Sequence, residues 1–177
     1  MSEQSERKSI RMPGYDYRQD GVYFVTICTH QREILFGHVA GETVSLNSFG
    51  EVVQQRWNEL PNHFPSAQLG SFIIMPNHVH AVVVINAYLI GARHASPLHS
   101  TASNGKRGSL GTIVGSFKSA SARIINEQRD TPSAPVWQRG YHDRIVRNER
   151  ELNAIREYIL YNPMRWEADE NNPQRSS

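Results

Sequence analysis

The stretch LGSFIIMPNHVHAVVVI, residues 69–85, decides the fold of this chain. Leu69 to Met75 and Val79 to Ile85 are two apolar runs, and the pair Pro76-Asn77 between them favours a turn. Apolar runs joined by so short a turn fold back on each other as an antiparallel hairpin. We therefore expect this hairpin to form the centre of a sheet.

Towards the N-terminus, the sequence predicts a strand, a small hairpin and a helix. Val22 to His30 is rich in β-branched and aromatic residues, which favours a strand. Ile34 to Val39 and Thr43 to Leu46 flank a glycine-containing break, which indicates a hairpin. Apolar residues at helical spacing follow, and we expect Pro61 to end that helix.

Towards the C-terminus, the pattern predicts a long loop and then a helix, a strand and a helix. Residues 86–108 show no periodicity and should form a mobile loop. Ser109 to Asn126 has an amphipathic helical pattern. Asp143 to Arg147 is typical of a short basic edge strand, and Glu149 to Asn162 should be a helix that ends before a proline.

This order of elements predicts one α+β domain. We expect a ferredoxin-like antiparallel sheet with helices packed on one face. A chain of 177 residues is long enough to bury a core of that size.

Composition indicates a soluble protein. The longest clean apolar stretch, Ala81 to Ile85, is far shorter than the roughly 20 residues that a membrane helix needs. Met1 to Arg11 carries no apolar segment like that of a secretory signal. We expect a cytoplasmic protein that does not enter a membrane.

Positive charge gathers in one part of the chain. The net charge is only +2, yet residues 105–147 hold eight basic and three acidic residues, an excess of five positive charges. Such clustering is typical of a nucleic-acid footprint, and it also describes an ordinary solvated face.

His78 and His80 are the first candidate site residues. Side chains alternate across a strand, so these two imidazoles point to the same face and can converge on one ion. Two histidines make half a metal site. A histidine pair at this spacing can equally be solvent-facing or part of a core.

Tyr158 and Asn162 are the second candidates. They lie four residues apart and share one helix face, so a phenol and an amide oxygen could reach the same histidine pair. The alternative is a tyrosine at the rim of a packed helix, followed by an ordinary helix-ending asparagine.

Together, these clusters resemble the single-tyrosine HUH transposases. The phrase MPNHVHAVVV, residues 75–84, is similar to the motif of two histidines around a hydrophobic residue, and REYILYNPMRW, residues 156–166, is similar to the nucleophile helix. The Asn-Pro after the tyrosine resembles the REP-associated tyrosine transposase branch in particular. The resemblance spans residues 15–166, which would form the catalytic domain between a polar segment at 1–14 and a frayed polar tail at 167–177.

The sequence departs from the family pattern in three places. The 86–108 loop is longer than expected, Ala81 stands where a bulky residue is commoner, and Asn162 replaces a glutamine of insertion-sequence relatives. None of these departures touches the tyrosine.

The resemblance implies a metal-dependent endonuclease and strand transferase. His78, His80 and Asn162 would hold one divalent ion, Mg²⁺ or Mn²⁺. Tyr158 would attack the phosphate to leave a 5′ phosphotyrosine, with Tyr161 as the fallback nucleophile.

The resemblance also implies a substrate of single-stranded or hairpin DNA of the REP type. Lys118, Arg139, Arg144 and Arg147 are candidates for phosphate contacts, which position a strand without reading its sequence. Relatives act as monomers or homodimers, and both states are compatible with the sequence.

Two other functions fit the same residues. One is a non-catalytic module that binds single-stranded nucleic acid on a ferredoxin-like sheet. The other is a metal phosphoesterase that attacks with bound water and leaves Tyr158 idle.

Overall fold

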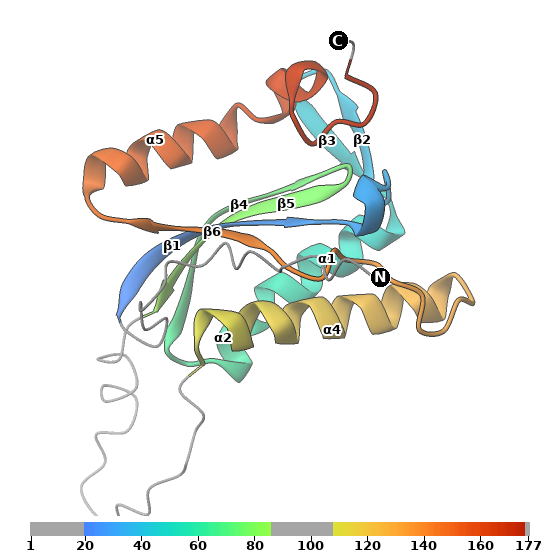
Figure 1. Ribbon diagram of the computed structural model, residues 1–177, viewed down its shortest axis with the longest axis horizontal. Helices are drawn as coiled ribbons and strands as arrows, with labels where there is room; N and C mark the ends of the chain where they lie inside the picture. Colours follow the sequence, from blue (N-terminus) through green and yellow to red (C-terminus); the bar gives the residue numbers. More distant parts are fainter. Residues whose placement is uncertain (1–19, 86–107, 176–177) are drawn as a thin grey trace, which may run out of the picture.

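The computed structural model describes residues 20–85 and 108–175 (Figure 1). The expected N-terminal segment 1–14 lies outside these residues. So does the expected loop 86–108, apart from Gly108.

A four-stranded antiparallel sheet forms the middle layer of the molecule. Its strands are β1 (Gly21–Cys28), β4 (Ala67–Met75), β5 (His78–Ile85) and β6 (His142–Val146), in the order β4-β5-β1-β6. All neighbouring pairs are antiparallel, and β4 and β5 are joined by the expected two-residue turn. The predicted hairpin, the basic edge strand and the ferredoxin-like order of elements are confirmed. The hairpin does not form the centre of the sheet as expected, because β4 is an edge strand and β5 pairs with β1 in the middle.

A separate small hairpin follows β1. A 3-10 turn, η1 (His30–Arg32), leads into β2 (Gly37–Ala40) and β3 (Thr43–Leu46), which pair antiparallel. Gly37 lies at φ 142° with the Ser45 carbonyl oxygen 2.1 Å from where a Cβ would stand, so glycine is required there. The predicted hairpin is confirmed, although its first strand begins later than expected.

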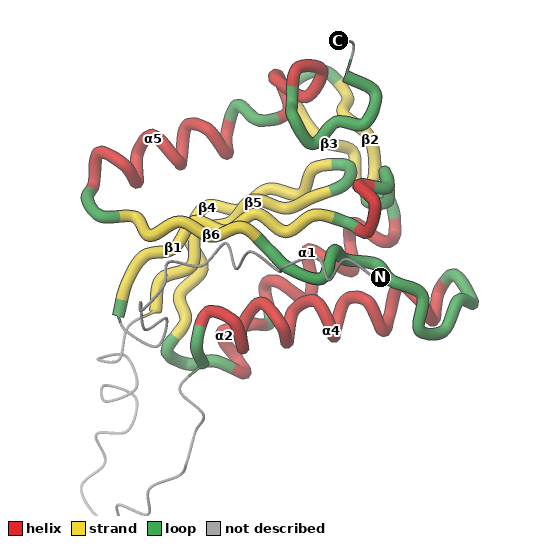
Figure 2. The backbone as a smooth tube through the Cα atoms, viewed as in Figure 1, coloured by secondary structure: helices red, strands yellow, loops and turns green. Residues whose placement is uncertain are grey.

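Two helices cover one face of the sheet (Figure 2). They are α1 (Ser48–Asn58), capped by the Asn47 side chain, and α4 (Leu110–Gln128), capped by Ser109. Pro61 does not end a helix as expected. It lies in the first turn of a second short helix, α2 (Leu60–His63), where the missing N–H of proline leaves no hydrogen bond unmade.

The third long helix, α5 (Glu149–Leu160), lies on the opposite face of the sheet (Figure 1). Its buried residues Ile155 and Ile159 pack with Val82 and Val146. The expectation of an α+β sheet with helices packed on one face holds for α1 and α4. The opposite face of the sheet is packed against α5, because alternate residues of β1 and β5 are apolar on that side too.

The C-terminal segment does not fray as expected. After α5 it forms a 3-10 helix, η2 (Pro163–Ala168), and then turns over the end of the sheet. Asp169, Asn171 and Asn172 are each exposed by 9% or less. Within residues 20–85 and 108–175, no helix has the length and apolar character needed to cross a bilayer.

Candidate active site

The two histidines lie at the start of β5 and face α5. His78 is opposite Cys28 and His80 is opposite Thr26 on β1. His78 is 0% and His80 2% exposed, while Val79 between them points into the core under α1 and α4. The strand alternation that the sequence predicts is therefore what brings the imidazoles together.

Hydrogen bonds fix the orientation of both rings. The Asn77 amide nitrogen donates to the Arg32 carbonyl at 2.9 Å and to the Asn171 carbonyl at 2.7 Å, so its oxygen faces His78 Nδ1 at 2.8 Å. His78 Nδ1 therefore donates, and its Nε2 carries a lone pair. His80 Nδ1 lies 2.8 Å from the Thr26 hydroxyl, which leaves Nε2 as its inward-facing nitrogen.

The two Nε2 atoms are 3.0 Å apart. Burial, helped by the positive charge of Arg32, lowers the pKa of His78 to about 3. Burial, followed by the proximity of His78, lowers the pKa of His80 to about 3 as well. Both rings are thus neutral near pH 7, and they present nitrogen atoms to one point. Two ligand atoms about 2.1 Å from one ion, at about a right angle, are about 3 Å apart, so the pair fits a divalent cation.

Tyr158 reaches this pair from α5. Its hydroxyl lies 3.2 Å from His80 Nε2, and its ring meets the Phe24 ring edge-on with centroids 6.0 Å apart. Burial and then the negative charge of Asp169 raise the pKa of the phenol, against a smaller opposing effect of the Asn162 amide. The phenol is therefore protonated at neutral pH. Tyr161, by contrast, is 45% exposed at the end of the helix.

Asn162 and Asp169 complete the cluster. Asn162 is 1% exposed and donates to an Asp169 carboxylate oxygen at 3.5 Å, while its own Oδ1 is buried with no hydrogen-bond partner in the described structure. Ligand atoms of His78, His80 and Asp169 all lie within 4.8 Å of one another. An unpaired buried amide oxygen and a buried carboxylate beside two neutral imidazoles are a donor set that could hold a metal ion.

Asp169 is the residue that sequence reasoning missed. It belongs to the segment expected to be a frayed tail, where acidic and amide residues gave no periodic signal. No local pattern marks it, because its approach to the histidines depends on the turn that the chain makes at η2.

Several contacts hold the C-terminal segment against the histidines. Arg32 donates to the Glu170 carbonyl, Cys28 Sγ lies 3.6 Å from Asn171 Oδ1, and Asn171 N–H donates to Asp169 at 2.7 Å. Burial raises the pKa of the Cys28 thiol, so this sulfur is protonated and serves in packing. The Trp166 ring lies beside His78, with centroids 6.1 Å apart.

The four basic residues expected to meet phosphate lie in two pairs: Lys118 contacts the backbone of Arg139, and Arg144 and Arg147 both contact Glu151. Lys118 on α4 donates to the carbonyls of Gln138, Arg139 and Gly140, and burial lowers the pKa of its ammonium. Arg139, Arg144 and Arg147 are exposed on or beside β6. Arg144 lies opposite Phe24 and lines the same cavity as Tyr158.

Comparison with known proteins places this geometry in context. No family model matches the chain. An uncharacterized protein of Haemophilus influenzae is 37% identical over 168 residues, which cover 93% of this chain and 92% of that protein. The solved structure of a REP-associated tyrosine transposase bound to a REP hairpin has a TM-score of 0.55 at 13% identity, covering 88% of this chain and 74% of the other. The chain thus belongs to the same family as the Haemophilus influenzae protein, and its fold is that of a tyrosine transposase.

Proposed function

We propose that this protein is a metal-dependent endonuclease and strand transferase of single-stranded DNA, with Tyr158 as its nucleophile. The observation that carries the proposal is the 3.2 Å separation of the Tyr158 hydroxyl from His80 Nε2, at a pair of neutral, inward-facing imidazoles. A nucleophile and a metal-binding pair this close can act on one phosphate.

His78, His80 and Asp169 would hold the ion, with the Asn162 amide oxygen beside them. Mixed nitrogen and oxygen ligands suit Mg²⁺ or Mn²⁺ better than a closed zinc site does. The ion would supply Lewis-acid stabilisation of a phosphate oxygen. The orphaned Oδ1 of Asn162 supports this donor set, because a buried acceptor without a partner is costly unless a ligand satisfies it.

The chain's own residues bring the reacting atoms together. The Tyr158 oxygen forms a bond to phosphorus as the bond to the 3′ oxygen breaks, the phenol loses its proton, and the departing 3′ oxygen gains one. This gives a 5′ phosphotyrosine and a free 3′ hydroxyl. The histidines are poor proton acceptors, since the pKa of each is about 3, and this favours a role as ligands over one as general bases.

Hairpin DNA of the REP type is the substrate that we propose. The transposase of similar fold is bound to a REP hairpin. The exposed cations Arg139, Arg144 and Arg147 lie on or beside β6, near the α5 face that carries Tyr158, where they can contact phosphates.

A phosphoesterase that uses bound water is the second candidate, because the same ligands could activate water. The position of the phenol against His80 favours the tyrosine reaction, since an idle tyrosine needs no such contact.

The deciding experiment compares Tyr158→Phe with Tyr161→Phe. Each full-length variant is incubated with end-labelled hairpin DNA from the genomic region around the gene, in Mn²⁺ or in EDTA, and run on a denaturing gel. The wild type and Tyr161→Phe should form a metal-dependent covalent adduct, and Tyr158→Phe should form none. Cleavage by Tyr158→Phe without an adduct would favour the phosphoesterase, and binding of DNA by every variant without cleavage would favour a non-catalytic module.

A further inference from the structure

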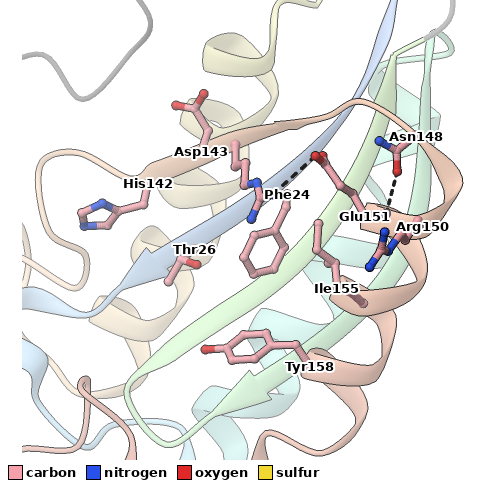
Figure 3. Close-up of a pocket in the computed structure, with 11 residues that line it drawn as sticks. Phe24, Thr26, His142, Asp143, Asn148, Arg150, Glu151, Ile155 and Tyr158 are labelled. Atoms are coloured by element: carbon pink, nitrogen blue, oxygen red, sulfur yellow. Dashed lines mark hydrogen bonds and ion pairs between the residues drawn. The ribbon is translucent and has the colours of Figure 1, made fainter.

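A cavity of about 720 Å³ opens between β1, β6 and α5, next to the tyrosine (Figure 3). Phe24 and Thr26 of β1 and Ile155 and Tyr158 of α5 line it. Figure 3 shows the Phe24 and Tyr158 rings both projecting into the space between strand and helix. Its volume lies within the usual range of small-molecule sites.

The inner wall of this cavity suits a flat apolar group. The Phe24 ring is held in place, because it stacks against His80 with centroids 5.4 Å apart and meets Tyr158 edge-on. Ala154 and Ile155 form the helix side. An aromatic ring between a strand and a helix is the kind of platform on which nucleobases stack.

The rim of the cavity carries a positively charged and a negatively charged side chain, and both can form hydrogen bonds. Arg144 Nη2 lies 3.6 Å from Glu151 Oε1, and the Arg144 side chain is 63% exposed. The other Glu151 oxygen accepts from the Arg147 N–H at 3.1 Å. An arginine donor and a carboxylate acceptor side by side can bind the polar edge of a base.

Tyr158 belongs to both the cavity and the histidine cluster. A group in the cavity therefore lies beside the same phenol that would face the phosphate, and this position suits the base of a nucleotide next to that phosphate. We propose that the cavity takes the nucleobase of the nucleotide adjoining the scissile phosphate, stacked on Phe24 with its edge towards the Arg144–Glu151 pair. This inference rests on the proposed function, and it names a specificity subsite for that reaction.

The subsite predicts a preference for single strands. A base can enter a cavity between a strand and a helix only when it is unpaired and turned out of its stack. Paired DNA has first to lose its stacking energy, so it binds more weakly.

The experiment fills the cavity from the helix side. Ala154 is exposed and lines the cavity, so Ala154→Leu adds bulk there in a good helix former. Asn153→Leu places the same leucine side chain at a neighbouring exposed position outside the cavity and is the control. The probe is a hairpin oligonucleotide with single-stranded flanks, intact or abasic at one nucleotide at a time. Affinity is measured in EDTA, so that no cleavage occurs, and adducts are mapped separately in Mn²⁺.

Removing the base next to the mapped cleavage position should weaken binding about tenfold in the wild type and in Asn153→Leu. Ala154→Leu should bind the intact probe about tenfold more weakly and lose little more with the abasic probe. A full tenfold abasic loss in Ala154→Leu, or unchanged affinity of that variant for the intact probe, would overturn the subsite. Binding that depends on one base and is lost in Ala154→Leu, without any adduct, would refute the cleavage proposal and keep only a base-binding role of the cavity, while absence of binding to every probe would refute both.

Discussion

The two faces of the sheet differ in what their side chains do. Under α1 and α4, Trp57 stacks on Phe72 with centroids 4.7 Å apart and meets Phe117 edge-on at 5.1 Å. Under α5, a small group of apolar residues packs around Ile155 and Ile159, and the remaining space holds the histidines, Tyr158 and a cavity. One face is a closed core, and the other has a smaller apolar cluster along α5 beside the histidines and the cavity.

β5 serves both faces with alternate residues. Val79, Ala81 and Val83 belong to the closed core, while His78 and His80 face α5. The closed face stabilises the strand so firmly that polar groups can be buried on its reverse side. The comparison predicts that mutations on the first face affect folding and those on the second affect ligands.

The largest expected effect is on the closed face. Phe117→Ala should lower the free energy of unfolding by about 4 kcal/mol, because it removes a ring that is 1% exposed and leaves a cavity. Urea denaturation measures this loss. Tyr158→Phe on the other face is the contrast and should change stability by less than about 1 kcal/mol. Equal losses in the two variants would contradict the division between the faces.

The second effect is a dependence of stability on pH. The folded pKa of His78 and of His80 is about 3, below the ordinary value of 6.5, so the unfolded chain takes up protons first as the pH falls. Stability is therefore full above pH 6.5 and is lost between pH 6.5 and 3.

Between pH 7.5 and 5.5 the two groups should together remove roughly 2 to 3 kcal/mol in EDTA. His78→Gln should halve that change, and His38→Gln on β2 is the matched control at an exposed site. The midpoints of urea denaturation at the two pH values measure this loss of stability. An unaltered pH dependence in His78→Gln would show that His78 is not buried in its neutral form.

A third effect concerns the ion. Asp169→Asn should weaken Mn²⁺ binding at least about tenfold, because it removes the carboxylate that lies nearest the two imidazoles. Titration calorimetry measures the affinity, with Glu170→Gln, an exposed neighbour, as control. Unchanged Mn²⁺ affinity in Asp169→Asn would limit the site to the histidines and Asn162.

The smallest effect compares a cation that follows β6 with a cation on α4. Arg147→Gln, at the end of β6, should reduce the slope of log affinity for single-stranded DNA against log salt by about 0.7. Arg123→Gln on α4, where Arg123 pairs with Glu127 at 3.5 Å, should leave that slope unchanged. The reverse result would place the DNA on the α4 face.

The sequence was enough to predict what depends on local periodicity. Alternation along β5 puts His78 and His80 on one face, and the helical spacing of Leu152, Ile155 and Ile159 turns Tyr158 towards them. The β4–β5 hairpin followed from its apolar runs and its turn for the same reason, although its place in the sheet did not.

What the sequence could not predict depends on contacts between distant segments. Asp169 looked like part of a solvated tail, yet it is buried because Arg32, Asn77 and Cys28 hold the segment that follows. Lys118 was a candidate phosphate contact, and its ammonium donates to three carbonyls of a loop about 20 residues away. Neither contact produces a periodic pattern in the nearby sequence.

Trp166 gives this site an optical reporter of its own. The protein has three tryptophans, and Trp57 and Trp137 are buried in the closed core, at 1% and 7% exposure, whereas the Trp166 ring lies beside His78. A paramagnetic ion arriving at the imidazoles should quench the fluorescence of that indole, and a diamagnetic one should leave most of its emission. Loading of the site can therefore be followed in real time with an unlabelled protein.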